Sequence, residues 1–124
     1  MEVNMETITV NGEEYVKKSS VKENKYLVVD GLEYCIVRSA RAGVFAGYVV
    51  SRNGMEVILK KARRIWYWSG AASLSQLANE GTKKPSECKF PAEVPYVVLT
   101  ESIEILPVSE NAKKSIDGVK EWRQ

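Results

Sequence analysis

Three dipeptides that favour tight turns recur in the first half of the chain: Asn11-Gly12, Asp30-Gly31 and Asn53-Gly54. Each lies between two runs of residues that are common in β-strands. Both positions of such a dipeptide tolerate positive φ, which the commonest two-residue hairpin turns require. The spacing therefore predicts β-hairpins at these three places and an antiparallel sheet.

The strands around the third turn are expected to bury one face, because a strand points alternate side chains to opposite faces. The strand before the turn has its apolar residues at even positions: Val44, Ala46, Tyr48 and Val50. The strand after it has them at odd positions: Met55, Val57 and Leu59.

This alternation fails in the segment KKARR. Lys60 and Lys61 are adjacent, so one charge would point to each face, and a bulge or a strand end is predicted there. In the following IWYW, residues 65–68, both faces carry aromatic side chains. We expect this segment to be covered on both sides, by the helix that follows or by another subunit.

Two short helices are predicted. The first covers about residues 71–80, with Ser69 as its N-cap and Gly81 as its C-terminal cap. The second begins after Ser109 and ends near Gly118, before a polar tail at 117–124 that contains Trp122.

Between the helices, a proline-punctuated loop precedes one long final strand, YVVLTESIEIL, at residues 96–106. Glu101 interrupts its apolar face and is expected to look into a cavity or an interface. The predicted fold class is α+β: a single domain over 1–124, with an antiparallel sheet or meander and two short helices.

Composition excludes several classes of protein. At 124 residues the chain can bury a core without disulfides or a metal, and no apolar run is long enough to span a membrane. The N-terminus has no secretory signal pattern, which predicts a cytosolic protein. Cys35 and Cys88 form no CxxC and are expected to be buried free thiols.

The charge balance argues against extensive phosphate binding. With 18 basic and 16 acidic residues the net charge is +2, too balanced for a protein that binds long nucleic acid. There is no histidine, which removes histidine-activated nucleophiles, imidazole acid-base catalysis and most zinc sites. We therefore expect no enzyme, no metal and no cofactor.

Two stretches have the residue types that bind flat, anionic ligands. In RRIWYWSGAASLSQLA, Arg63 and Arg64 offer planar donors, while residues 66–68 offer aromatic faces and the N–H groups of residues 70–72 suit a phosphate. A tryptophan-rich strand that packs against its own helix would explain the same residues without a ligand.

The second stretch is RSARAGVFAG, where Arg38 and Arg41 flank a tight segment. Gly43 and Gly47 would let a backbone approach a ligand, and Phe45 has the parity opposite to the apolar face. Ordinary turn and bulge geometry would explain these glycines equally well.

Three segments together carry a family resemblance: RSARAGVFAG, then SRNGMEVILKKARRIWYWSGAASLSQLANEGTKKPSECKF, then VVLTESIEILPV. They resemble the first-described family of bacteriophage Thoeris anti-defence sponges, over about Leu32 to Ile116. The arginine-aromatic-GAASLSQLA block is the most distinctive part, and residues 1–31 lie outside the resemblance.

The resemblance implies a function. Members of that family bind cyclic ADP-ribose isomers made by bacterial TIR-domain enzymes and hold them intact, so the host effector is not activated. Some members also sequester cyclic trinucleotides at a separate site. They act in the cytoplasm of the host bacterium as homo-oligomers whose pockets include residues of neighbouring subunits.

On this basis we expect Phe90 or Trp66 to stack on the adenine, and Thr100 to make a polar contact. Trp68 and the glycine segment at 43–47 would border the site. The arginines expected near the pyrophosphate are Arg38, Arg41, Arg63 and Arg64. Two alternatives stay open: a single-stranded nucleic-acid binder that uses KKARRIWYW as a basic-aromatic platform, and a phage structural or assembly protein.

Overall fold

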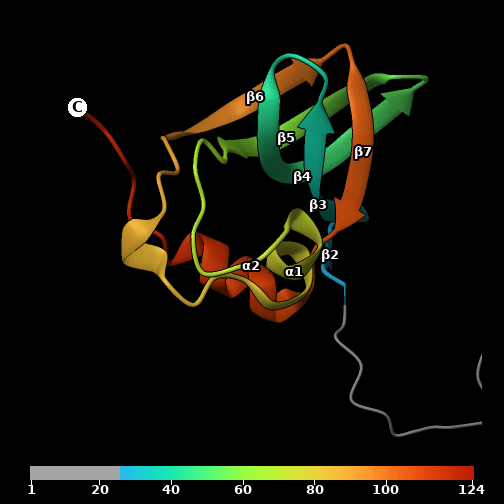
Figure 1. Cartoon of the computed structure of the whole chain (residues 1–124). Coiled ribbons are helices and arrows are strands. Elements are labelled where there is room, and N and C mark those ends of the chain that lie inside the picture. Colours follow the sequence, from blue (N-terminus) through green and yellow to red (C-terminus); the bar gives the residue numbers. More distant parts are fainter. Residues whose placement is uncertain (1–25) are drawn as a thin grey trace, which may run out of the picture.

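The computed structural model describes residues 26–124, which form a six-stranded antiparallel sheet with two short α-helices. This confirms the predicted α+β class (Figure 1). The elements are β2 (Val28–Val29), β3 (Leu32–Ser39), β4 (Gly43–Asn53), β5 (Glu56–Arg64), α1 (Leu74–Glu80), the 3-10 helix η1 (Pro85–Glu87), β6 (Glu93–Leu99), β7 (Ser102–Pro107) and α2 (Glu110–Asp117). The hairpin expected at Asn11-Gly12 lies outside the described residues.

Two of the predicted hairpins are present. Asp30 and Gly31 join β2 to β3 with φ values of 55° and 78°, as a two-residue turn of this class requires. In the β4–β5 hairpin Asn53 pairs with Glu56, so the central residues are Gly54 and Met55. Only the first of these two has positive φ, at 62°, so the turn lies one residue later than Asn53-Gly54.

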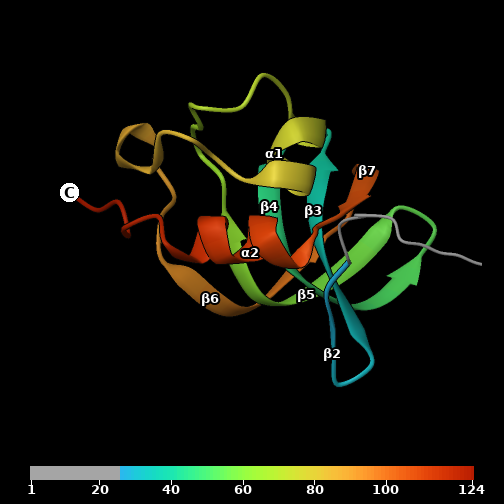
Figure 2. The ribbon, with the colours of Figure 1, turned by 90° about the horizontal axis from the view of Figure 1, so that it is seen from below.

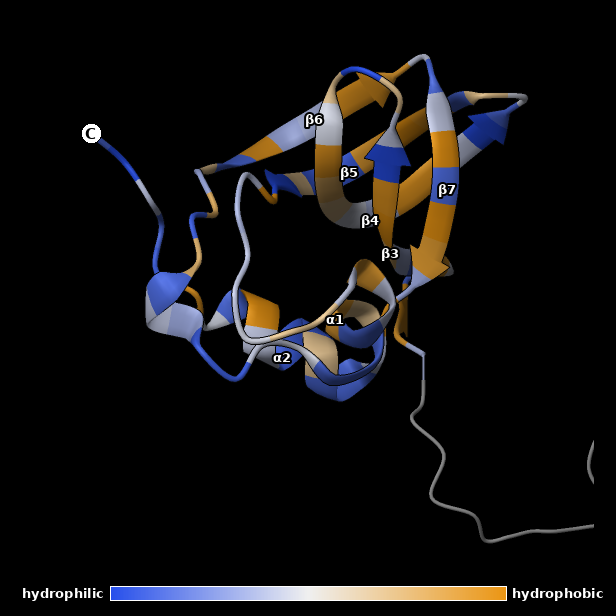
Figure 3. Cartoon of the chain, in the orientation of Figure 1, coloured by the Kyte–Doolittle hydropathy of each residue, from blue (hydrophilic) through white to orange (hydrophobic). Residues whose placement is uncertain are grey.

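Strand β3 is the centre of the sheet and is buried on both faces. It pairs with β4 on one side and with β2 and β7 on the other. Tyr34 and Ile36 pack into a core cluster with the helices, while Cys35 and Val37 pack into a second cluster inside the curl of the sheet. Figure 3 shows the apolar colour concentrated along the strands.

The expectation that β4 buries a single face is wrong. Val44, Ala46 and Tyr48 pack towards the helices, but Phe45 is buried in the other cluster. Val50 is 42% exposed because the register of β4 against β5 shifts between Val49 and Ser51.

The predicted bulge in KKARR is present. Tyr48 pairs with Lys60 and Ala46 pairs with Arg63, so Gly47 alone lies opposite Lys61 and Ala62. A Cβ atom at Gly47 would lie 3.1 Å from the Ala62 Cα, which explains the glycine. The extra residue turns Ala62 into the core and leaves Lys61 exposed, and β5 continues to Arg64.

The single long strand predicted for 96–106 is wrong. The chain breaks at Thr100 and Glu101 into β6, which pairs with β5, and β7, which pairs with β3. The two strands therefore lie at opposite edges of the sheet and diverge from a shared turn (Figure 1). Glu101 lies in that turn, where a polar residue is ordinary.

The two helices pack against each other beneath the sheet (Figure 2). α2 is capped by the Ser109 side chain, as predicted. α1 is shorter than predicted: its N-cap is Ser73, whose hydroxyl accepts from the Gln76 N–H, and Ser69 instead donates to Glu87. Gly81 ends α1 at φ 79°, as predicted.

The segment IWYW is not covered on both sides within the described residues. Ile65 is buried, but Trp66 is 63% and Tyr67 is 52% exposed. Among residues 26–124, no helix is long and apolar enough to cross a membrane.

Candidate binding pocket

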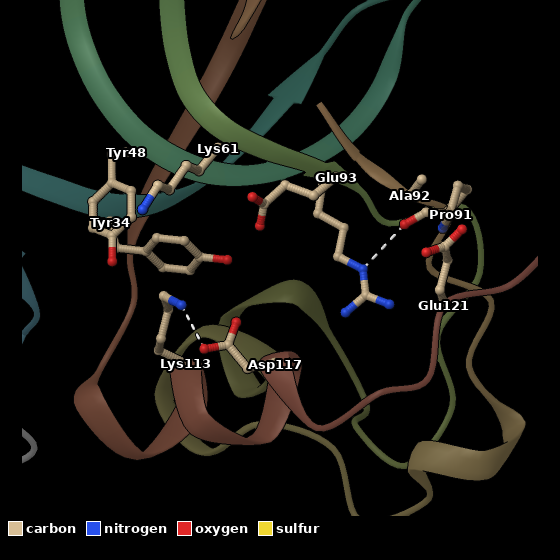
Figure 4. Close-up of a pocket in the computed structure, with 10 residues that line it drawn as sticks. Tyr34, Tyr48, Lys61, Pro91, Ala92, Glu93, Lys113, Asp117 and Glu121 are labelled. Carbon is tan, nitrogen blue, oxygen red and sulfur yellow. Dashed lines mark hydrogen bonds and ion pairs between the residues drawn. The ribbon is translucent and has the colours of Figure 1, made fainter. Parts of the chain in front are cut away.

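A cavity of about 390 Å³ opens between the sheet, α2 and the segments that precede β6 and follow α2 (Figure 4). This volume is in the range of sites for small ligands. Its lining contains two tyrosines, three cations and three carboxylates. The lining residues are Tyr34, Tyr48, Lys61, Arg63, Pro91, Ala92, Glu93, Lys113, Asp117 and Glu121.

The two tyrosines come from directly paired positions of β3 and β4. The Tyr34 and Tyr48 rings meet edge to face, with centroids 5.0 Å apart. Burial, and next the charge of Asp117, raise the pKa of Tyr34 far above its ordinary value. Its hydroxyl therefore stays protonated and available as a hydrogen-bond donor at the cavity wall.

Helix α2 contributes an ion pair to the same wall. Lys113 and Asp117 are one helical turn apart, and the lysine Nζ bonds the aspartate carboxylate. The same Nζ lies 4.7 Å from the centre of the Tyr34 ring and 5.9 Å from that of Tyr48. The helix and the tyrosine pair are thereby held together by a cation over aromatic faces.

Arg63 holds the segments around the cavity in place. Its guanidinium donates to four backbone carbonyls, those of Phe90, Pro91, Ile116 and Val119, at 2.7–3.1 Å. The carbonyls belong to the approach to β6 and to the end of α2. A guanidinium has five N–H donors and an ammonium has three, so a lysine at this position could not make all four bonds.

Lys61 differs from the other two cations of the cavity. Within residues 26–124, its side chain makes no hydrogen bond or ion pair, and it extends from the β5 bulge into the cavity (Figure 4). Lys113 is paired with Asp117, and Arg63 is bonded to carbonyls. With respect to the described part of the chain, the ammonium group of Lys61 is therefore free to bind an anion.

Of the ten residues predicted to bind a ligand, Arg63 lines this cavity. Phe90 is fully buried, with the Arg63 guanidinium carbon 5.4 Å from its ring centre. Phe90, one of the two aromatics expected to stack on the adenine, is therefore a core residue. Phe90 anchors the loop in the core, so it has no free face for an adenine.

The expected residues near the β3–β4 turn lie together but are largely paired with protein groups. Arg38 pairs with Glu104 at 2.9 Å, and Arg41 pairs with Glu101, which lowers the pKa of that carboxyl. Thr100 is the exposed neighbour of Glu101 in the β6–β7 turn.

Arg64 and Phe45 belong to the same end of the sheet. Arg64 donates to the Ala42 carbonyl, and its guanidinium carbon lies 4.3 Å from the ring centre of Phe45, which is buried. Gly43 has φ 95° and closes the turn. Because these groups satisfy one another, this end of the sheet is a polar turn stabilised by ion pairs and cation–π contacts.

The two tryptophans lie outside the cavity lining. Trp66 is mostly exposed, whereas Trp68 packs on the core and donates its indole N–H to the Ala71 carbonyl at 3.2 Å. The phosphate site expected at the N–H groups of residues 70–72 is not formed, because the helix begins at Leu74 and the Ala72 N–H is bonded to Gln76.

Sequence reasoning missed most of the cavity. No sequence motif marked Tyr34, Tyr48 or Lys113, because these residues come together only through the pairing of β3 with β4 and the docking of α2. Lys61 had a local signal, since KKARR predicted the bulge that directs it outward. Among the described residues, no cluster of His, Cys, Asp and Glu could hold a metal ion.

Comparison with known proteins identifies one family. The family model described as a domain of unknown function, DUF6948, matches residues 32–116, which is more than half of the chain. No curated protein and no solved structure matches the chain. The chain therefore belongs to the DUF6948 family.

Proposed function

We propose that this protein binds a cyclic ADP-ribose-type nucleotide in the cavity between the sheet and α2 and holds it without degrading it. The observation that carries the proposal is the composition of the cavity: a lysine without a partner among the described residues, and a tyrosine pair, beside three carboxylates. In a bacterial host, such binding would withdraw the signal of a TIR-domain immune enzyme, as the sequence resemblance implies.

Each part of such a ligand has a matching group in the cavity. The ammonium of Lys61 suits a phosphate oxygen. Carboxylates accept hydrogen bonds from ribose hydroxyls, and Glu93 lies at the wall for this role. Asp117 and Glu121 also line the cavity, each in an ion pair, with Lys113 and with Arg123. Tyr48 is partly exposed and offers an aromatic surface to a base.

Sequestration is favoured over turnover by the side-chain chemistry. The chain has no histidine for acid-base catalysis. Among the tyrosines of residues 26–124, the one whose pKa is strongly raised, Tyr34, is held in its neutral form. These groups can bind and orient a nucleotide, but they provide no activated nucleophile at neutral pH.

The alternative of single-stranded nucleic-acid binding has less support. In the KKARRIWYW segment Arg63 and Arg64 direct their donors to backbone carbonyls, so the basic-aromatic platform loses two of its cations. Trp66 and Tyr67 are exposed, which keeps a contact surface available. The resemblance further implies self-association, for which that surface would also serve.

Calorimetric titration with cyclic ADP-ribose isomers tests the proposed function. We expect saturable binding, and we expect intact ligand when the complex is heat-denatured and the released molecule is analysed. Arg38→Gln serves as the control variant, because Arg38 lies outside the cavity and the loss of its charge should leave the affinity for the nucleotide unchanged. Release of altered ligand would show an enzyme, and binding of oligonucleotides alone, with steep salt dependence, would favour the alternative.

A further inference from the structure

Lys61 occupies a backbone conformation that its side chain disfavours. Its φ is 52°, in the left-handed region where a Cβ crowds the following carbonyl. In one class of β-bulge, this position is normally a glycine. The bulge itself keeps a charge out of the core, but a glycine would fill the position with less strain.

The Lys61 side chain makes no polar contact with the described residues that would offset this strain. Lys61 is exposed, and within the described part of the chain its side chain forms no hydrogen bond or ion pair. Its neighbour Lys60 has an ordinary negative φ and pairs in the sheet with Tyr48 and Tyr96. The strained residue is therefore the one whose ammonium reaches the cavity.

We propose that Lys61 is the residue that binds the anionic phosphate of the ligand, and that the chain keeps a lysine at this strained bulge position for that purpose. The inference rests on the proposed function for the identity of the nucleotide. Its two parts are separable: the ammonium supplies binding, and the lysine backbone lowers stability. Strain of this kind is typical of positions kept for a function.

The geometry favours Lys61 over the other cavity cations. An incoming anion would have to compete with Asp117 for Lys113 and with four carbonyls for Arg63. Among residues 26–124, Lys61 has no acceptor to give up, so binding through it breaks no contact with this part of the chain. The β5 bulge presents it from the wall opposite α2 (Figure 4).

Three variants of the full chain separate charge from strain. Lys61→Gln removes the charge and keeps the strained backbone, while Lys61→Gly removes both. Lys60→Gln is the matched control, because it makes the same change of charge one residue away, outside the lining of this cavity. Thermal unfolding is measured without ligand, and affinity is measured for cyclic ADP-ribose, ADP-ribose and inorganic pyrophosphate.

We expect Lys61→Gln and Lys61→Gly to weaken nucleotide binding by about tenfold or more, because each loses a charge-assisted contact. Lys61→Gly should also raise the melting temperature by about 2–6 °C, since the strain is relieved. Lys60→Gln should bind within about twofold of the wild type, given the screening of charges that lie outside the site.

Several results would overturn this inference. Nucleotide affinity unchanged in Lys61→Gln would show that the proposed function stands and Lys61 takes no part in it. If the melting temperature of Lys61→Gly is at or below that of the wild type, the backbone at Lys61 is not strained as proposed. If the wild type binds pyrophosphate through Lys61 but binds neither nucleotide, the proposed function fails and the anion site stands. If the wild type binds none of the three probes, both proposals are overturned.

Discussion

Phe90 and Trp66 show that large aromatic residues have opposite roles in this chain. Both are large aromatics beside basic residues, yet Phe90 is fully buried and Trp66 is 63% exposed. The Phe90 carbonyl explains the difference: it accepts from Arg63 and from the backbone N–H of Trp122, and these bonds fix the loop over the core. Burial is decided by such long-range contacts, which no local pattern reports.

Phe90→Ala is therefore expected to destabilise the fold by about 3–5 kcal/mol, the usual cost of emptying a buried phenylalanine site. Trp66→Ala should change the free energy of unfolding by less than about 1 kcal/mol, because its side chain is largely in water already. Urea unfolding at neutral pH measures both. Equal losses in the two variants would contradict the assignment of Phe90 to the core.

At the scale of elements, local residue chemistry decides where the turns form, whereas the pairing of strands decides where the strands end. Asp30 and Gly31 form their turn because both adopt positive φ, and Gly81 ends α1 for the same reason. The break at Thr100 and Glu101 has no such signal. It arises because β6 and β7 pair with different partners, β5 and β3.

Gly81, at the end of α1, also lies against Ser115 of α2. A Cβ atom there would lie 2.3 Å from the Ser115 Cβ on α2 and would meet positive φ as well. We expect Gly81→Ala to destabilise the fold by about 3 kcal/mol or more, from overpacking added to backbone strain.

Gly54→Ala is the matched control for this prediction. Gly54 has φ 62°, but a Cβ atom there meets nothing within 4 Å. Its substitution should cost only about 1 kcal/mol, from the strained backbone alone. Urea unfolding of the two variants measures the difference, and similar losses would show that α1 and α2 are not tightly packed at this point.

At the scale of the molecule, the stability of the fold depends on keeping the buried ionisable side chains of β3 neutral. Cys35 and Tyr34 are adjacent on β3 and buried in the two different clusters. Burial, with the nearby charge of Glu33, raises the pKa of Cys35 from 9.0 to about 12, and burial raises the pKa of Tyr34 as well. Both groups must be protonated in the folded chain.

The fold should therefore lose stability in alkali. The raised pKa of Cys35 means that its contribution is complete below pH 9 and is lost as pH rises towards 12, because the unfolded thiol ionises first. Between pH 8 and 10.5 we expect the wild type to lose about 2 kcal/mol more than Cys35→Val, which has no group to titrate there.

Urea unfolding at a series of pH values measures this dependence. Tyr34 adds to it above pH 10, the ordinary pKa of a tyrosine, and does so in both proteins. Equal pH dependence of the wild type and Cys35→Val would show that Cys35 ionises as easily in the folded chain as in the unfolded one.

The sequence by itself determined the features that depend on neighbouring residues. The Asp30-Gly31 turn, the bulge in KKARR, the Ser109 cap and the Gly81 helix end all follow from local backbone preferences and hydrogen bonding. The absence of histidine likewise limits the chemistry wherever the residues lie.

Only the tertiary structure decided which strands pair and which side chains meet. The cavity joins Tyr34, Tyr48, Lys61 and Lys113, which come from three strands and a helix spread over 80 positions. Their meeting depends on the pairing of β3 with β4 and on the docking of α2, contacts that stabilise the fold only once distant segments are in place. Local sequence patterns carry the preferences of single segments, and a binding cavity is a property of how the segments assemble.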